Sequence, residues 1–181
     1  MLGELEEELR KLLRGLDGQT AIFLGCFAVL GAQMAWIAAK GPLPAPPALP
    51  TLTGLAAILA AHSFFLASRG LQHWINAVDM RLGPGSGWAL LESAMLSSKA
   101  FSLESGQGEG AGEFKLRRGA LKVPGPIMRA RRMAWLAPLI LTSAAVLFKF
   151  QNLESAALVC GGGALLGALE AVKLQRMMQV A

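Results

Sequence analysis

Charged residues are scarce in this sequence. Asp, Glu, Lys and Arg make up 16% of the 181 residues, whereas hydrophobic residues make up 54%. A soluble domain has about a quarter charged residues, and here four long stretches contain almost none. This scarcity excludes an ordinary soluble domain and predicts a chain that is partly surrounded by lipid.

Cysteine and histidine are also rare, with two of each. Cys26 and Cys160 lie in apolar stretches at different expected depths, about 9 Å from one face and about 8 Å from the other at a helical rise of 1.5 Å. This separation excludes a disulfide within one chain. His62 and His73 lie on one predicted helix, 11 residues apart, so they cannot both ligate one haem iron, and they are too few for a zinc site. We therefore expect no cofactor and no metal.

Four apolar stretches approach the roughly 20 residues that a membrane-spanning helix needs. They cover about residues 20–39, 52–75, 133–148 and 155–172. Short connections join the first to the second and the third to the fourth. The sequence therefore predicts an all-α polytopic membrane protein with four transmembrane helices arranged as two hairpins, residues 19–81 and 133–173, together with amphipathic cytosolic helices.

Positive charge is distributed unevenly around these spans. The two short connections contain Lys40 and Lys149, and the other 15 of the 17 Lys and Arg residues lie in the N-terminal arm, in residues 69–132 and at the C-terminal end. Because basic segments stay on the cytosolic side, we expect both termini, the tail at 174–181 and the loop at 82–132 to face the cytosol, in a bacterial inner membrane or a eukaryotic organellar membrane. This explains the net charge of +5 without nucleic acid as a partner, since no nucleic-acid-binding motif accompanies it.

The N-terminal arm, residues 1–18, has leucines at alternating spacings of three and four. These are Leu2, Leu5, Leu9, Leu12 and Leu16. They form a short heptad seam, but two heptads are too few for an autonomous coiled coil. The arm is predicted to be an amphipathic helix that lies on the bilayer or on its own protein, or to offer its seam to a partner helix.

The central loop has a second predicted amphipathic helix, about residues 87–103, and then a glycine-rich segment. A basic cluster follows within the 18 residues before the third span. Its members are Lys115, Arg117, Arg118, Lys122, Arg129, Arg131 and Arg132. Such a cluster attracts anionic lipid headgroups with roughly 1 kcal/mol per residue, or serves only to set the topology.

Polar residues inside the spans are candidates for function because burying them in lipid is costly. His62 is expected to face the bundle at mid-membrane depth, with Gln33, Thr142 and Ser143 as possible partners. Arg69, His73 and Asn76 follow His62 at offsets of 7, 11 and 14 residues. They form a polar stripe that either lines a solute path or hydrogen bonds to another helix.

Three features of the last two spans concern packing. Gly163 and Gly167 form a small-xxx-small pair that lets another helix approach closely. Pro138 is expected to kink the third span, and Glu170 is expected to pair with Lys173 near the cytosolic boundary. None of these features amounts to a catalytic arrangement.

The sequence contains no nucleophile with a histidine and a carboxylate at a comparable depth, so we expect a non-enzymatic protein. The favoured hypothesis is an accessory, assembly or scaffold subunit of a larger membrane complex. A small oligomeric channel or transporter that uses the polar face of the second span is the first alternative. A membrane-shaping or anionic-lipid-binding protein is the second. The expected partners are other membrane-protein subunits or further copies of the chain, together with anionic lipids.

Overall fold

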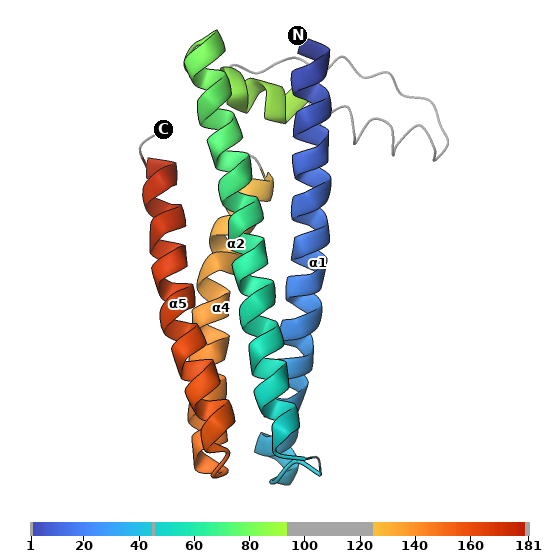
Figure 1. The fold of residues 1–181 in the computed structure, drawn as a ribbon, viewed down its shortest axis with the longest axis vertical. Coiled ribbons are helices and arrows are strands. Elements are labelled where there is room, and N and C mark those ends of the chain that lie inside the picture. Colours follow the sequence, from blue (N-terminus) through green and yellow to red (C-terminus); the bar gives the residue numbers. More distant parts are fainter. Residues whose placement is uncertain (1, 45, 94–124, 180–181) are drawn as a thin grey trace, which may run out of the picture.

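The chain is all-helical over the residues that the structure describes. The computed structural model describes residues 2–44, 46–93 and 125–179, with only the backbone at residues 2–3, 125–131 and 177–179. Its long helices are α1 (Leu2–Lys40), α2 (Ala48–Leu82), α4 (Gly125–Phe150) and α5 (Glu154–Gln179), and a shorter helical segment covers residues 86–93 (Figure 1). Each long helix has a stretch that is long and apolar enough to cross a membrane. The predictions of an all-α chain and of four such helices are confirmed.

The long helices pack in the order α1, α2, α5, α4, and α1 touches α4 at few places. Consecutive long helices run in opposite directions, so α2 and α5 are parallel (Figure 1). The N-terminal end of α1 and the C-terminal end of α5 lie toward the same end of the bundle (Figure 1). Ring centroids of Phe23 and Phe64 are 5.2 Å apart across the contact of α1 with α2. Leu141 and Phe148 of α4 are fully buried. Large side chains therefore fill an apolar interior.

α1 is one uninterrupted helix, with no boundary near residue 18, where the sequence predicted the end of the N-terminal arm. Large buried side chains recur along it every seven residues, at Leu9, Leu16, Phe23, Leu30 and Ile37. A seven-residue repeat keeps a seam facing the same neighbour in left-handed helix packing. The arm thus continues the axis of the first apolar stretch and packs on its own protein.

α2 begins earlier than the sequence predicted because a proline is tolerated in the first turn of a helix. Its first residue is Ala48, and Pro50 lies within the first turn. At the other end α2 continues beyond the apolar stretch and ends at Leu82, as the Gly83-Pro84-Gly85 sequence predicts. Gly83, at a φ of 103°, donates its N–H to the carbonyl oxygen of Asp79 at 3.0 Å.

The helical segment at residues 86–93 is held against α2. The Asp79 carboxylate accepts the N–H of Gly87 at 2.7 Å, which caps the N-terminus of the segment. A Cβ at Gly87 would lie 2.7 Å from the carbonyl oxygen of Ile75, so only glycine fits there. Leu91 on the same segment is fully buried. The predicted amphipathic helix in this region is thus helical over its described part.

The connection between α4 and α5 is a tight turn that ends α4. Asn152 has a left-handed φ of 58° and donates its N–H to the carbonyl oxygen of Lys149 at 3.1 Å. Leu153 donates to the carbonyl oxygen of Phe148 at 2.9 Å. This pair of bonds is the Schellman motif, in which asparagine or glycine takes the left-handed position. Three residues thus reverse the chain and place α5 directly beside α4.

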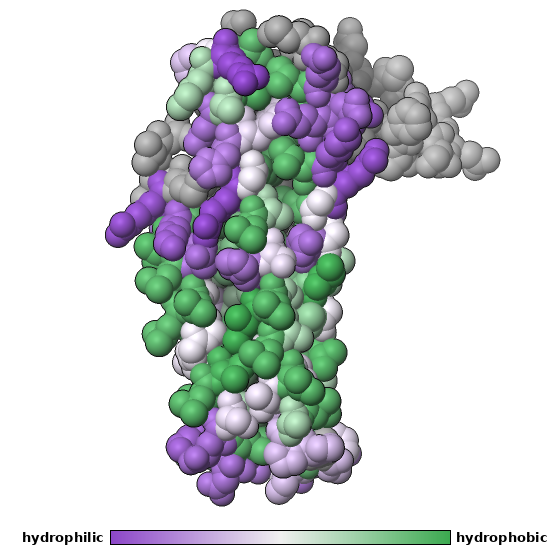
Figure 2. Space-filling model, in the orientation of Figure 1, coloured by the Kyte–Doolittle hydropathy of each residue, from purple (hydrophilic) through white to green (hydrophobic). Residues whose placement is uncertain are grey.

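On the face of the bundle shown in Figure 2, a hydrophobic band lies between hydrophilic side chains at both ends. All four long helices contribute exposed large side chains, among them Leu24, Leu59, Leu139 and Leu165, which are 53 to 72% exposed. α1 has 39 residues and α2 has 35, so they are about 58 and 52 Å long, against about 30 Å of hydrocarbon in a bilayer. Both helices extend past the hydrophobic band at the N-terminal end of α1. We call residues 2–19 of α1 and 69–82 of α2 the stalk.

Candidate functional site

His62 lies exposed on the outer surface of α2, so the expectation that it faces the bundle is wrong. The reason is the phase of the helix: at 3.6 residues per turn, His62 lies about 200° from Phe64, which is buried in the core. The hydroxyls of Thr142 and Ser143 donate instead to carbonyl oxygens of α4 itself, at 2.7 and 3.0 Å. The structure does not bring these polar residues to His62.

Gln33 is buried and joins α1 to α2. Its Nε2 donates to Oγ1 of Thr53 at 2.9 Å, and the Thr53 hydroxyl donates to the carbonyl oxygen of Leu49 at 2.9 Å. Oε1 of Gln33 is buried and has no hydrogen-bond partner among the described residues. The arrangement is a polar link between two helices near the connecting loop.

The polar stripe of α2 does not line the interior of the bundle. His73 is exposed on the stalk. Asn76 accepts a hydrogen bond from Nε2 of Gln72 at 3.1 Å, and Arg69 faces α5. Within a single chain the stripe is therefore divided between the stalk surface and the contact of α2 with α5.

An ion cluster joins α2 to α5 where the hydrophobic band meets the stalk. The guanidinium of Arg69 pairs with the carboxylate of Glu170, and these side chains are 23% and 17% exposed. Lys173 lies 3.6 Å from the same carboxylate, which confirms the predicted Glu170–Lys173 pair. Arg69 was not expected as the nearer partner, because it comes from a helix about 100 residues away in the sequence.

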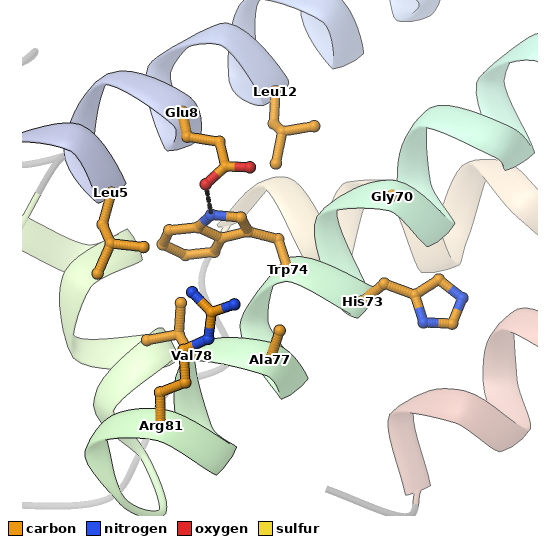
Figure 3. Close-up of a pocket in the computed structure, with 9 residues that line it drawn as sticks. All are labelled: Leu5, Glu8, Leu12, Gly70, His73, Trp74, Ala77, Val78 and Arg81. Atoms are coloured by element: carbon orange, nitrogen blue, oxygen red, sulfur yellow. Dashed lines mark hydrogen bonds between the residues drawn. The ribbon is translucent and has the colours of Figure 1, made fainter. Parts of the chain in front are cut away.

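A cavity of about 340 Å³ lies between α1 and α2 in the stalk. We call it the stalk cavity, and Figure 3 shows the side chains around it. It is lined by Leu5, Glu8, Leu12, Gly70, His73, Trp74, Ala77, Val78 and Arg81. It begins at Gly70, directly after Arg69, so it sits just beyond the hydrophobic band. Its volume is at the lower end of the range for small-molecule and side-chain pockets.

Trp74 forms the centre of the cavity wall. Its ring is nearly buried, and its Nε1 donates to Oε2 of Glu8 at 3.2 Å, so the indole is fixed between the two helices (Figure 3). Arg81 also lines the cavity, and the imidazole of His73 points away from the Trp74 ring (Figure 3). Gly70 also lines the cavity, and a Cβ added there would meet no atom within 4 Å, so the cavity has unfilled space beside this residue. The cavity thus combines an apolar wall with one acidic and one basic side chain.

The leucines of the N-terminal arm divide between core and cavity. Leu9 and Leu16 are buried within the chain, and Leu5 and Leu12 are half-buried and line the cavity. The side chain of Leu2 is outside the described residues. The described part of the seam predicted for a partner helix is therefore partly buried inside the chain, where α1 packs against α2, and partly open at the stalk cavity.

The glycines of α5 lie at helix contacts. A Cβ at Gly163 would lie 2.4 Å from Cγ1 and Cδ1 of Ile58 in α2, and one at Gly167 would lie 3.6 Å from Cδ of Pro138 in α4. On α2, a Cβ at Gly54 would lie 2.9 Å from Sγ of Cys160. Close approach of α5 to α2 therefore depends on a glycine on each helix.

Most of the basic cluster predicted to contact anionic lipid lies outside the described residues. This holds for Lys115, Arg117, Arg118 and Lys122, while Arg129 and Arg131 are placed only by the backbone of α4. Arg132 is exposed at the start of the apolar part of α4. Contact with anionic lipid stays a prediction.

Among the described residues, no group of three or more His, Cys, Asp or Glu side chains is arranged to hold a metal ion. Of the residues that line the stalk cavity, Leu5, Leu12 and His73 were singled out from the sequence, whereas the others were missed, above all Glu8, Trp74 and Arg81. A signal was present, because Trp74 at the end of the apolar stretch and Val78 just beyond it are four residues apart and share one face of a helix, and an apolar face of this kind needs a neighbour. No family model matches this chain, and neither a curated protein nor a solved structure does.

Proposed function

We propose that this chain is a non-enzymatic scaffold or accessory subunit of a larger membrane complex. In this proposal it crosses the bilayer four times as two hairpins, with both termini and the stalk on the cytosolic side. The distribution of basic residues supports this orientation, since only Lys40 and Lys149 lie in the short connections. The stalk is then a rigid platform that projects into the cytosol.

The stalk cavity is the observation that carries the proposal. Its wall of Leu5, Leu12 and Val78 is apolar, and Glu8 and Arg81 place opposite charges at its rim. A buried apolar centre with a polar rim is the pattern of protein-protein contact sites, where a few anchoring side chains supply most of the binding energy. The occupant that fits is an apolar or aromatic side chain on a partner subunit.

The alternative of a channel along the polar face of the second span gains no support from the geometry of a single chain. His62 and His73 are exposed on the outside, and Phe23, Phe64 and Phe148 fill the interior. A solute path through one copy would require polar side chains to converge along the space between the helices. Among the described residues, the Gln33–Thr53 link joins α1 to α2, and the Arg69–Glu170 pair joins α2 to α5 at the edge of the hydrophobic band, so the two do not form one path.

Filling the stalk cavity should release the partner. We expect Ala77→Trp to lower the amount of bound partner at least tenfold, because an indole at the cavity edge occupies the volume that the partner's anchor needs. The measurement is extraction of the native protein in mild detergent, followed by sizing and by quantification of the proteins that co-elute in fixed ratio.

Met80→Trp is the matched control, since Met80 is 88% exposed on the same helix and does not line the cavity. It should leave the complex intact. The proposal is overturned if the wild-type chain elutes without any partner in fixed ratio, or if Ala77→Trp and Met80→Trp retain the partner equally.

A further inference from the structure

The outer face of α2 has a second heptad pattern that the four-helix bundle does not use. Its residues alternate at spacings of three and four and belong to the exposed surface. They are Leu52, Leu55, Leu59, His62 and Leu66. The four leucines are 60, 44, 67 and 51% exposed. We call this set the outer seam.

Other residues of α2 make its contacts inside the chain. Phe64 meets α1 through Phe23, and Gly54 and Ile58 meet α5 at Cys160 and Gly163. No described part of the chain covers the outer seam. Leucines need no cover in lipid, but their alternating three-and-four spacing is the one that packs two helices in left-handed contact, the commonest geometry between membrane helices.

His62 is the residue of the outer seam that lipid cannot accommodate well. It lies seven residues before Arg69, or about 10 Å along the helix toward the membrane interior. No hydrogen bond joins it to any described residue. A lone ionisable side chain at such a depth is costly unless another protein surface offers it a partner.

We propose that the outer seam binds the outer seam of a second copy of this chain, in a parallel α2–α2 pair. A twofold axis along the membrane normal places identical residues of two copies at the same depth. The leucines then meet leucines, and His62 meets His62 of the other copy. Neutral imidazole is both a donor and an acceptor, so two such rings complete one hydrogen bond between them.

This self-complementarity favours a second copy over a different subunit. A single polar residue within an apolar heptad seam fixes the register and the number of helices in a coiled coil, and His62 has that position here. The inference rests on the membrane placement in the proposed function, but it is independent of the stalk cavity and of any partner bound there.

Disulfide cross-linking in native membranes tests the pairing. Leu55→Cys and Leu59→Cys place thiols on the outer seam, whereas Leu165→Cys places one on the outer face of α5, where Leu165 is 72% exposed. A disulfide needs Cα atoms about 4.4 to 6.8 Å apart. With a mild oxidant, at least one seam variant should give a species of twice the chain mass at ten times or more the yield of Leu165→Cys, and the parent with its native cysteines should give none.

His62→Ala provides the second measurement, by energy transfer between labelled copies in lipid vesicles. The dissociation constant of the pair should rise about threefold, which corresponds to one interhelical hydrogen bond of about 0.6 kcal/mol in a membrane. Equal cross-linking at Leu59→Cys and Leu165→Cys, with no energy transfer, overturns the pairing. Cross-linking of Leu59→Cys to a different protein also overturns it, but leaves the scaffold proposal standing.

Discussion

Replacing Glu170 with leucine should destabilise the bundle by about 3 kcal/mol, the lower end of the range for breaking a buried ion pair. The substitution leaves the guanidinium of Arg69 only 23% exposed and without the one carboxylate that pairs with it among the described residues. The long side chain of Arg69 can recover part of the lost stability by extending toward the membrane surface. The measurement is the free energy of unfolding in mild detergent titrated with a denaturing detergent.

Replacing Arg69 with leucine should lower the free energy of unfolding by less than Glu170→Leu does, so comparing the two variants is informative. Arg69→Leu leaves Glu170 with Lys173, whose Nζ is already 3.6 Å from the carboxylate. Arg69→Leu combined with Glu170→Leu should be more stable than Glu170→Leu alone, because no unpaired charge stays behind. If Arg69→Leu were the more damaging single substitution, the cluster would not be organised around the Glu170 carboxylate as described.

The substitution Gly163→Leu should be the most disruptive single change within the apolar stretches of the long helices. A Cβ alone would lie 2.4 Å from two side-chain carbons of Ile58, and a leucine adds three more carbons at the same place. Overpacking of this kind costs about 3 kcal/mol or forces the helices apart. Thermal stability in mild detergent and the fraction of monodisperse protein report the loss.

Gly162→Leu is the matched control, because a Cβ at the neighbouring Gly162 would meet no atom within 4 Å. It should leave stability unchanged or raise it slightly, since leucine favours a helix more than glycine does. Ile58→Ala should partly rescue Gly163→Leu by making room on α2. Equal damage from Gly162→Leu and Gly163→Leu would show that flexibility of α5, and not its contact with α2, is what the glycines provide.

The sequence was sufficient to predict the four apolar helices and the end of α2 at Gly83, because length, hydropathy and glycine act locally. It was insufficient to predict which face of a span is buried. In water the polar face of a helix marks the outside, but in lipid both faces are apolar. On α2 the buried face contains Ala57 and Phe64, and the exposed face contains Leu59 and Leu66. Hydropathy cannot separate these two faces, and for this reason the expected orientation of His62 was wrong.

For the same reason, the full length of the seven-residue repeat in α1 could not be predicted from hydropathy. Leucines of the arm stand out against charged neighbours, so the pattern was visible as far as Leu16. Beyond that point Phe23, Leu30 and Ile37 continue it among residues that are all apolar. The candidate site was harder still to predict, because the stalk cavity joins Glu8 to Trp74, 66 residues apart in the sequence. Nothing local indicates such a pair before the helices are placed side by side.

The unbroken course of α1 gives the protein a mechanical property. Because one row of buried side chains runs from Leu9 to Ile37 along an uninterrupted helix, the rotational phase of the stalk end of α1 is fixed relative to that of its other end. Inserting one residue near Gly18 would turn one end by about 100° relative to the other, whereas inserting seven would nearly restore the phase. Torque applied to the stalk end of α1 would therefore be transmitted along the helix to its part within the hydrophobic band.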